Sequence, residues 1–544
     1  LRLDGGIPDC GSLIRADLSG LAEVAGEDPE PEFVAINEAN EVAATLQENN
    51  HVVVLAADGN VLSHFSAGAV DLEGIDTSED GRLEFAGSLA GVRREPDAVA
   101  WLGDERLLVV NEGDYEGGSR GFSIFSRAGE LLYESGPGFE REAARAGHYP
   151  EGRSENKGVE PEGMTVASFG GETYIFVLAE RASVVGVYRD AGTEPEFVQL
   201  LPSGLSPEGV VAIPERDLLA VASEVDLGSD EGVRAHVSLY RYGASEAAYP
   251  TIVSDLDEAG RPIGWGALSG LAADPARPGI LYAVSDSYYS MQPTIFTLDV
   301  NHAPARIIGA TRVTRGGANA QLLDLEGVAA DGEGGFWLAS EGRSDRLIPH
   351  ALLHVGADGE IIEQVAFPPE LLAHETRFGA EGVTLIGDTL WIALQRPWAD
   401  DPEDAVKLLA YHLDDRSWAA VRYPLEPTER GWVGLSEITA YGDFVYIVER
   451  DNQIGQAAAL KKLYRVPIAE LMPVPLGEEL PLVSKEEVYD FLPDLRASGG
   501  YVLDKLEGFA IDAEGNGFAV TDNDGVDDSN GETALLRVGP FGSR

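Results

Sequence analysis

The chain has 544 residues, of which 44% are hydrophobic, so it is long enough and apolar enough to bury one or more large cores. It carries 93 acidic and 39 basic residues, for a formal net charge of −54. Such an acidic surface repels nucleic acid and anionic lipid, and no apolar run approaches the roughly 18 residues that span a bilayer. We therefore expect no nucleic-acid partner and no membrane insertion.

The single cysteine, Cys10, excludes an internal disulfide framework. It is either inert or a link between two chains. The sequence starts with Leu, and a cleaved export signal would explain the missing Met. The many carboxylates either keep the surface hydrated in salt or bind Ca²⁺, which prefers oxygen ligands.

The N-terminal segment, residues 1–31, is polar and contains a short apolar stretch at 12–24. A repeating unit begins at Glu32. Its first copy has four short apolar runs, at 32–36, 41–48, 51–55 and 61–65, separated by turns rich in Asn, Asp and Gly. Four strands joined by short turns predict an antiparallel meander.

The opening strand of this unit recurs along the whole chain. We place the opening strands at 32–36, 96–100, 161–166, 207–213, 268–272, 325–329, 380–386, 435–440 and 506–511. A second apolar strand follows each of them, as in the hairpin of 506–511 with 518–521, whose turn is Glu-Gly-Asn-Gly. Few stretches favour helix: 139–146, 467–472 and 485–495.

Repeated four-stranded units of this length are typical of propeller blades. The sequence therefore predicts an all-β protein, a β-propeller of four-stranded antiparallel blades. The nine openings exceed the usual number for one ring, so we expect a large single ring or two rings, with blades in 32–260 and in 261–544. The last unit shows only three strands, and a strand from 12–24 could complete it and close the ring.

A carboxylate stands at the start of most opening strands. This first row comprises Glu32, Asp97, Glu162, Glu208, Glu326, Glu381, Glu437 and Glu507. Opening strands of a propeller are innermost, so these groups should face the central channel or its mouth. They either accept backbone N–H bonds from the next blade, as a clasp, or hold Ca²⁺ together, since converging like charges would otherwise repel.

A second row of polar residues follows the second strands. It comprises Asn111, Glu112, Gly113, Asp114, Glu180, Arg181, Glu224, Asp226, Asp286, Glu341, Arg343, Gln395, Arg396, Glu449, Arg450, Asp451, Asn452, Asp522, Asn523 and Asp524. Second strands end on one rim of a propeller, so these side chains should gather there. Acidic groups mixed with Arg could bind a metal and an anion together, or they could form a lattice of salt bridges.

Two loops add further candidates. The loop 522–528 holds Asp522, Asp524, Asp527 and Asp528, which suits calcium although the EF-hand spacing is absent. The loop 148–158 contains His148, Arg153 and Lys157; it is either an anion clamp or a blade-linking loop held by ion pairs. The usual motifs of serine hydrolases, zinc proteases, P-loop NTPases and C-x-x-C proteins are absent from the sequence.

The C-terminal stretch carries a family resemblance. The residues L-E-G-F-A-I-D-A-E-G-N-G-F-A-V-T-D-N-D-G-V-D-D (506–528) resemble the end of the bacterial phytase-like domain, also called the esterase-like activity of phytase family, and the resemblance covers about residues 260–540. Residues 97–115 are similar to exported propeller modules found with that domain. The resemblance implies a propeller fold, export to a periplasmic or extracellular location, calcium dependence and hydrolysis of phosphoric esters.

Two functional hypotheses follow. The first is an exported, calcium-dependent phosphoesterase acting on a small phosphate ester. Its metal-binding candidates are Glu162, Glu208, Glu326, Glu381, Glu437, Glu507, Asp522, Asp524, Asp527 and Asp528, and its catalytic candidates are Arg181, Arg343, Arg396, Arg450, Lys157 and His148. The second is a non-catalytic extracellular protein, a homo-oligomer or larger assembly, whose acidic surface uses Ca²⁺ to bridge copies of itself or other molecules.

Overall fold

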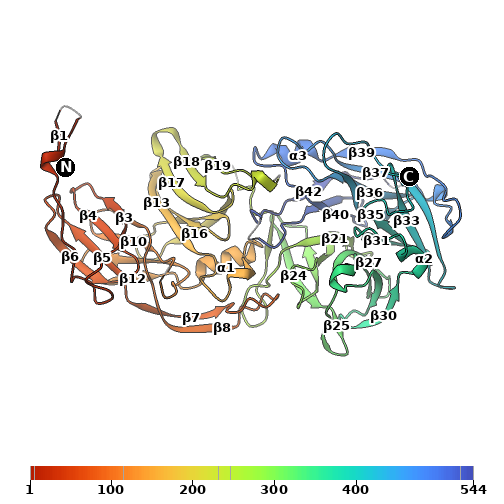
Figure 1. The fold of residues 1–544 in the computed structure, drawn as a ribbon, viewed down its shortest axis with the longest axis horizontal. Helices are drawn as coiled ribbons and strands as arrows, with labels where there is room; N and C mark the ends of the chain where they lie inside the picture. The colour runs from red at the N-terminus through yellow and green to blue at the C-terminus, as the bar shows by residue number, and fades with distance from the viewer. Residues whose placement is uncertain are drawn as a thin grey trace.

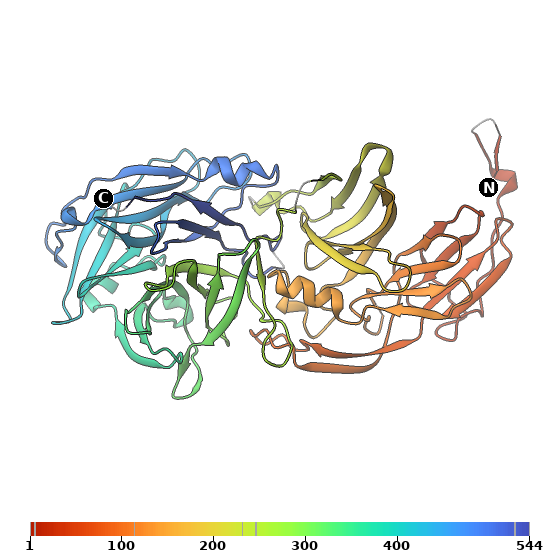
Figure 2. The same ribbon diagram turned by 180° about the vertical axis from the view of Figure 1, so that it is seen from behind.

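The protein is elongated, and its two termini lie at opposite ends (Figure 1; Figure 2). The computed structural model describes residues 2–4, 7–113, 115–230, 232–244, 247–526 and 529–542. Most sheets are antiparallel, and many have four strands in chain order, which confirms the predicted all-β propeller architecture. Among the described residues, none of the helices is both long and apolar enough to cross a membrane.

The N-terminal half contains four successive sheets and two hairpins. The sheets are β3 (Pro31–Ile36), β4 (Val42–Leu46), β5 (His51–Leu55) and β6 (Val61–Ser66); β9 (Val99–Leu102), β10 (Arg106–Val110), β11 (Phe122–Ser126) and β12 (Leu131–Glu134); β13 (Pro161–Phe169), β14 (Glu172–Ala179), β15 (Val184–Arg189) and β16 (Glu196–Pro202); and β17 (Pro207–Ile213), β18 (Leu218–Ser223) and β19 (His236–Arg241). The hairpins are β1 (Arg2–Asp4) with β2 (Ile7–Asp9), and β7 (Ala69–Ile75) with β8 (Gly87–Arg93). The helix α1 (Gly138–Arg145) follows the second sheet.

The C-terminal half contains five larger sheets. They are β21 (Leu268–Ala273), β22 (Ile280–Ser285), β23 (Thr294–Asp299) and β24 (Ala305–Arg312) with β20 (Ile252–Ser254); β27 (Leu325–Ala330), β28 (Phe336–Ser340), β29 (Ala351–Val355) and β30 (Ile361–Ala366); β31 (Ala380–Ile386), β32 (Thr389–Leu394), β33 (Ala405–His412) and β34 (Trp418–Pro424) with β38 (Val474–Pro475); β35 (Val433–Tyr441), β36 (Phe444–Asp451), β37 (Lys461–Pro467) and β39 (Glu486–Asp490); and β40 (Leu506–Ile511), β41 (Gly517–Thr521) and β42 (Leu535–Val538). The hairpin of β25 (Thr314–Arg315) and β26 (Ala318–Asn319) and the helices α2 (Pro369–Leu372) and α3 (Leu492–Ala497) lie between them in sequence.

The five C-terminal sheets form a ring. Their inner strands pack in the order β21, β27, β31, β35 and β40, and β40 packs in turn against β21. Each sheet is thus covered by a neighbour on both faces, which explains why the inner strands are buried along most of their length. The ring is closed by contact between the first and last blades of residues 252–538.

The four N-terminal sheets form an arc instead. The inner strands β3, β9, β13 and β17 pack in sequence, but no contact of comparable extent joins β17 to β3 among the described residues. Both ends of the arc expose apolar side chains, with Ile36 of β3 66% exposed and Leu239 of β19 68% exposed. The expectation of one large ring or two rings is therefore corrected to one closed ring and one open arc.

The predicted ring-closing strand at 12–24 is wrong. The described strands include none in that range, and the last sheet has only the three strands β40 to β42. The N-terminal segment lies at the end of the molecule farthest from this sheet (Figure 1). Closure comes instead from β40 packing against β21.

The recurring Glu-Gly step of the opening strands is a β-bulge at the point of closest approach between blades. The register between β27 and β28 shifts at Leu325–Gly327, and the same shift occurs in β40. A Cβ atom on Gly327 would lie 2.3 Å from the carbonyl oxygen of Glu381, and one on Gly508 would lie 2.6 Å from that of Ser269. Glycine at these positions allows the inner strands to pack backbone to backbone.

The two halves share a packed junction around α1. The indole of Trp265 donates a hydrogen bond to the carbonyl of Arg145 at 2.9 Å. The side chain of Asn523 donates to the carbonyl of Gly147 at 2.9 Å and accepts from the backbone of Ala267 at 2.6 Å. The loop after β41 is therefore anchored to the arc as well as to the ring.

Candidate functional site

Several members of the two polar rows predicted from the sequence meet at one rim of the closed ring. They line a cavity of about 250 Å³, which we call the mouth cavity. Its walls are formed by Asp286, Ser287, Asp324, Glu326, Glu341, Arg343, Arg377, Phe378, Glu381, Gln395, Trp432, Arg450, Asp504, Lys505, Glu507 and Asp522. The starts of inner strands and the ends of second strands supply most of the carboxylates, as expected for adjacent antiparallel strands.

Three carboxylates converge on one side of the mouth cavity. Asp324 and Glu326 are two residues apart at the start of β27, so their side chains share a face of the strand. Glu341 follows β28, which pairs antiparallel with β27 through Leu325 and Ser340. One oxygen from each of the three carboxylates lies within 4.8 Å of the others, and this acidic trio could hold a metal ion.

The pKa values of Glu326, Glu341 and the neighbouring Glu381 lie above their ordinary range. Burial, and then the charge of Asp324, raises the pKa of Glu341 to about 7. Burial and the neighbouring Glu381 raise the pKa of Glu326, and burial with Glu341 raises that of Glu381. Crowded carboxylates of this kind either share protons or bind a cation, and a donor set made only of carboxylate oxygens fits a hard cation such as Ca²⁺.

Two cationic side chains, Arg450 and Lys505, also line the mouth cavity. Arg450, only 3% exposed, donates to Glu507 at 2.5 Å and to the hydroxyl of Ser436 at 2.9 Å. Burial alone would raise the pKa of Glu507, but the charges of Arg450 and Lys505 outweigh it and lower that pKa. Glu507 is therefore ionised and paired, unlike the acidic trio.

The aspartate loop after β41 is held by a lysine in its first part. Lys505 donates to Asp522 at 3.1 Å and also to Asp524. Burial raises the pKa of Asp522 to about 6, even though the charge of Lys505 lowers it. Asp527 and Asp528, the other two candidates from this loop, lie outside the described residues.

Glu437 occupies a different place from the rest of its row. Ser436 stands where β27, β31 and β40 have Glu, and Glu437 takes the position of their Gly. Its carboxylate accepts hydrogen bonds from the backbone N–H groups of Leu271 and Ile438, each at 2.9 Å. Fully buried between the inner strands, Glu437 acts as the backbone clasp that was one of the two interpretations of this row.

The arc carries a second acidic cluster. Oxygens of Glu162, Glu180 and Glu208 lie within 4.8 Å of one another, as do those of Glu112, Glu160 and Glu180. Burial, then the charges of Glu180 and Glu208, raises the pKa of Glu162 to about 9. This cluster is therefore also able to exchange protons for a cation.

Lysine and arginine candidates border this second cluster. Lys157 donates to Glu112 at 2.9 Å, and Arg181 donates to Glu160 at 3.2 Å. Arg153 also pairs with Glu160, at 2.6 Å. The loop 148–158 is thus held by ion pairs, one of the two alternatives that the sequence left open.

His148 and Arg396 do not line the mouth cavity. His148 is fully buried and donates through Nδ1 to the carbonyl of Ala182 at 2.9 Å, while its Nε2 contacts the hydroxyl of Tyr249. Burial lowers the pKa of His148 to about 4, so the ring is neutral at pH 7 and joins the halves rather than binding an anion. Arg396 stacks 4.3 Å from the ring centroid of Phe378, which itself lines the cavity.

Several lining residues were missed by the sequence analysis. Asp324 had a usable signal, because it precedes Glu326 by two residues and must share its face of the strand. Arg377, Phe378 and Trp432 come from irregular segments before β31 and β35, where no periodicity places a side chain. Only the closed ring brings these segments to the same rim.

Comparison with solved structures gives distant neighbours. Virginiamycin B lyase from Staphylococcus aureus is 10% identical, covering 78% of this chain and 93% of its own, with a TM-score of 0.20. PorZ of Porphyromonas gingivalis is 12% identical, covering 90% of this chain and 64% of its own, with a TM-score of 0.27. No curated protein matches the chain.

Two family models match the chain, one in each half. Residues 115–193, within the arc, match the choice-of-anchor I domain. Residues 263–525 match the family described as "Phytase-like: Esterase-like activity of phytase". That span includes every residue that lines the mouth cavity. The chain thus carries a phytase-like domain, and the closed ring is its fold.

Proposed function

We propose that the mouth cavity is the site of a metal-assisted phosphoric-ester hydrolase. The observation that carries this proposal is the presence of a buried acidic trio and two guanidinium groups, Arg343 and Arg377, around one cavity of a phytase-like domain. Carboxylates suit a hard divalent cation, and guanidinium groups suit phosphate oxygens. The combination of carboxylates and guanidinium groups favours a phosphate ligand that is bound together with a divalent cation.

The residues of the cavity have distinct roles in this proposal. Asp324, Glu326 and Glu341 would hold Ca²⁺, which when bound neutralises phosphoryl oxygens and helps to ionise a water molecule. Arg343 and Arg377 bind the remaining phosphate oxygens. Asp522, with a pKa of about 6, is in the range of a general base and takes the proton from the attacking water.

The substitution Glu326→Gln tests the acidic trio. It removes one anionic ligand at nearly constant volume, so the calcium affinity should fall by more than about tenfold, since even outer-shell changes cost 10–100-fold. Calorimetric calcium titration and the rate of 4-nitrophenyl phosphate hydrolysis measure the effect. Glu333→Gln is the matched control, because Glu333 is exposed in the turn after β27. Equal affinity and rate in both variants would refute the site.

We also propose that the protein is exported to the cell surface or the periplasm. Support comes from the choice-of-anchor I match in the arc. Fractionation of cells that produce the full-length protein tests the proposal. Recovery only in the cytoplasmic fraction would contradict it.

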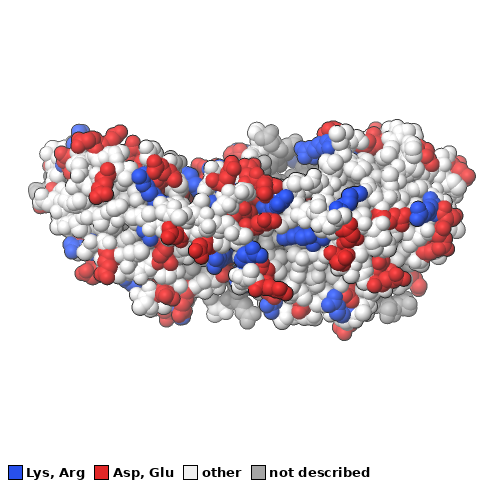
Figure 3. All heavy atoms as spheres, turned by 90° about the horizontal axis from the view of Figure 1, so that it is seen from below, with Lys and Arg blue, Asp and Glu red and all other residues white. Residues whose placement is uncertain are grey.

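A second candidate function is calcium-bridged assembly without catalysis. It is favoured by the formal charge of −54 and by the spread of Asp and Glu over both halves of one face (Figure 3). Surfaces of this charge repel one another unless counter-cations intervene. Light scattering should then report a larger mass with calcium than with chelator. A constant mass, together with calcium-dependent ester hydrolysis, would leave the hydrolase as the function.

A further inference from the structure

A larger cavity adjoins the mouth cavity and is not used by the chemistry proposed above. Its volume is about 600 Å³, within the range of small-molecule sites. The two cavities share Asp286 and Ser287, so they lie next to each other along that wall. We call the larger one the side cavity.

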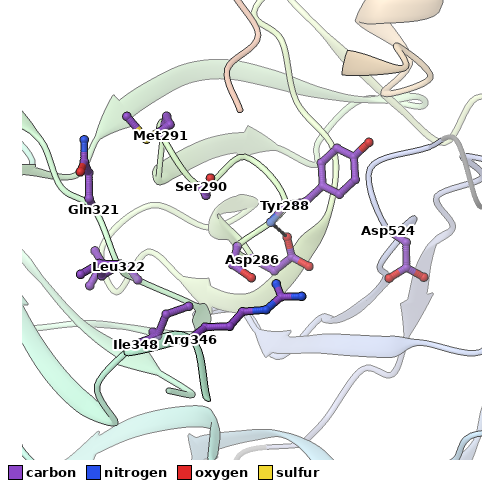
Figure 4. A pocket seen from close by; sticks show the side chains of 11 residues that line it. Asp286, Tyr288, Ser290, Met291, Gln321, Leu322, Arg346, Ile348 and Asp524 are labelled. Atoms are coloured by element: carbon purple, nitrogen blue, oxygen red, sulfur yellow. Dashed lines mark hydrogen bonds between the residues drawn. The ribbon is translucent and has the colours of Figure 1, made fainter. Parts of the chain in front are cut away.

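The side cavity has an apolar side. Figure 4 shows Leu322 and Ile348 on one side, Tyr288 and Asp524 on the other, and Arg346 extending between them. Met291 and Leu323 add further apolar surface. Ile348 is only 9% exposed and Leu323 only 4%, so they form a fixed wall, whereas Leu322 is 57% exposed.

The charges of the side cavity are few and of mixed sign. The charged lining residues are Asp286, Asp524 and Arg346. Asp286 accepts a hydrogen bond from the backbone of Tyr288 at 2.7 Å, and Asp524 pairs with Lys505. One guanidinium beside two carboxylates gives no net attraction for a group that carries several phosphates.

We propose that the side cavity binds the organic part of the substrate, so that the domain selects phosphate esters of apolar or aromatic alcohols rather than inositol polyphosphates. This inference rests on the proposed function, since the phosphate must occupy the mouth cavity. The organic group then passes the shared wall at Asp286 and lies against Leu322 and Ile348. Arg346 can contact a single polar or anionic substituent on that group.

The reaction balances with water as the only co-reactant. The oxygen of water forms a bond to phosphorus, and the bond between phosphorus and the ester oxygen breaks. Asp522 receives the proton of the attacking water and returns it to the departing alkoxide. The products are inorganic phosphate in the mouth cavity and a neutral alcohol in the side cavity.

Two leucines make a matched pair for the test. Leu322 lines the side cavity, whereas Leu347 does not. Leu347 is also a surface residue that is 80% exposed. Both have a left-handed backbone, with φ of 59° and 60°. Asp tolerates that conformation, and neither side chain is in the core, so Leu322→Asp and Leu347→Asp should both fold normally.

The experiment separates binding from turnover. Naphthylmethylphosphonate and methylphosphonate, which cannot be hydrolysed, are titrated into the calcium-loaded full chain, and 2-naphthyl phosphate and phytate are assayed for hydrolysis. We expect the naphthyl compound to bind at least about tenfold more tightly than methylphosphonate. Leu322→Asp should abolish this preference and lower kcat/KM for 2-naphthyl phosphate by about tenfold, while Leu347→Asp should change neither.

The outcomes distinguish the two proposals. Tight naphthyl binding that depends on Leu322 without hydrolysis of any ester would support the side cavity and refute the hydrolase. Hydrolysis that is unaffected by Leu322→Asp, or faster with phytate, would refute the side cavity and keep the hydrolase. Absence of phosphonate binding, or equal binding of both compounds, would also refute the side cavity.

Discussion

Metal-free protein is expected to lose stability as the pH rises from 5 to 8, and calcium is expected to remove most of that loss. Burial raises the pKa of Glu341 to about 7 and that of Glu162 to about 9, whereas both groups titrate near 4.5 in the unfolded chain. Between those values the folded state binds more protons than the unfolded state. Stability must therefore fall as pH increases through this window.

The size of the effect follows from the same shifts. Each pH unit between the unfolded and folded pKa of one carboxyl costs about 1.4 kcal/mol, so Glu341 alone contributes about 2–3 kcal/mol between pH 5 and 7. Calcium competes with these protons and should stabilise the protein more at pH 8 than at pH 5. Thermal unfolding at the two pH values, with chelator or with calcium, measures both trends.

The net charge of the protein requires a control for screening. Salt at equal ionic strength weakens general repulsion among surface carboxylates, but it cannot replace a coordinated cation. Sodium chloride should therefore recover less stability at pH 8 than calcium does. A flat pH dependence in chelator, or equal recovery by sodium, would contradict the two acidic clusters as sites of proton and cation exchange.

The substitution Arg450→Met is expected to destabilise the ring by about 3–5 kcal/mol, the usual cost of removing one partner from a buried ion pair. Arg450 is 3% exposed and compensates Glu507, which is 5% exposed and lies on the inner strand β40. Without it, the buried carboxylate of Glu507, next to Glu381, keeps Lys505 as the cation that opposes its charge. Chemical denaturation of the full chain measures the loss.

A surface pair and a double variant serve as controls for this prediction. Arg465 on β37 pairs with exposed Glu486, so Arg465→Met should cost no more than about 1 kcal/mol. Adding Glu507→Gln to Arg450→Met removes the uncompensated charge and should restore part of the lost stability. If Arg450→Met were no more harmful than Arg465→Met, the ion pair would not stabilise the ring.

The blades were readable from the sequence because each is built from local hairpins. The alternation of apolar runs and Gly/Asn turns placed the hairpin 506–511 with 518–521, which the structure has as β40 and β41. The number of blades in the ring was not readable in this way. It depends on whether Leu271 of the first blade meets the last blade, and no local pattern encodes a contact across more than two hundred residues.

The sequence predicted the site residues whose side-chain direction is determined by strand geometry, and it did not predict the others. Glu326, Glu381 and Glu507 were expected at the mouth because inner strands start there, and all three line the cavity. Glu437 shows the limit of the method, since a shift of one residue within the bulge moved its carboxylate from the rim to the clasp. Phe378 and Trp432 depend on loop conformation, which periodicity does not describe.

Closure by the first and last blades has a consequence for the order of folding. β21 is synthesised early and β40 only at the end of translation of this domain. One face of the first blade therefore stays uncovered until the last sheet has been synthesised and has folded. Until then the incomplete ring offers apolar surface to chaperones or to other nascent chains.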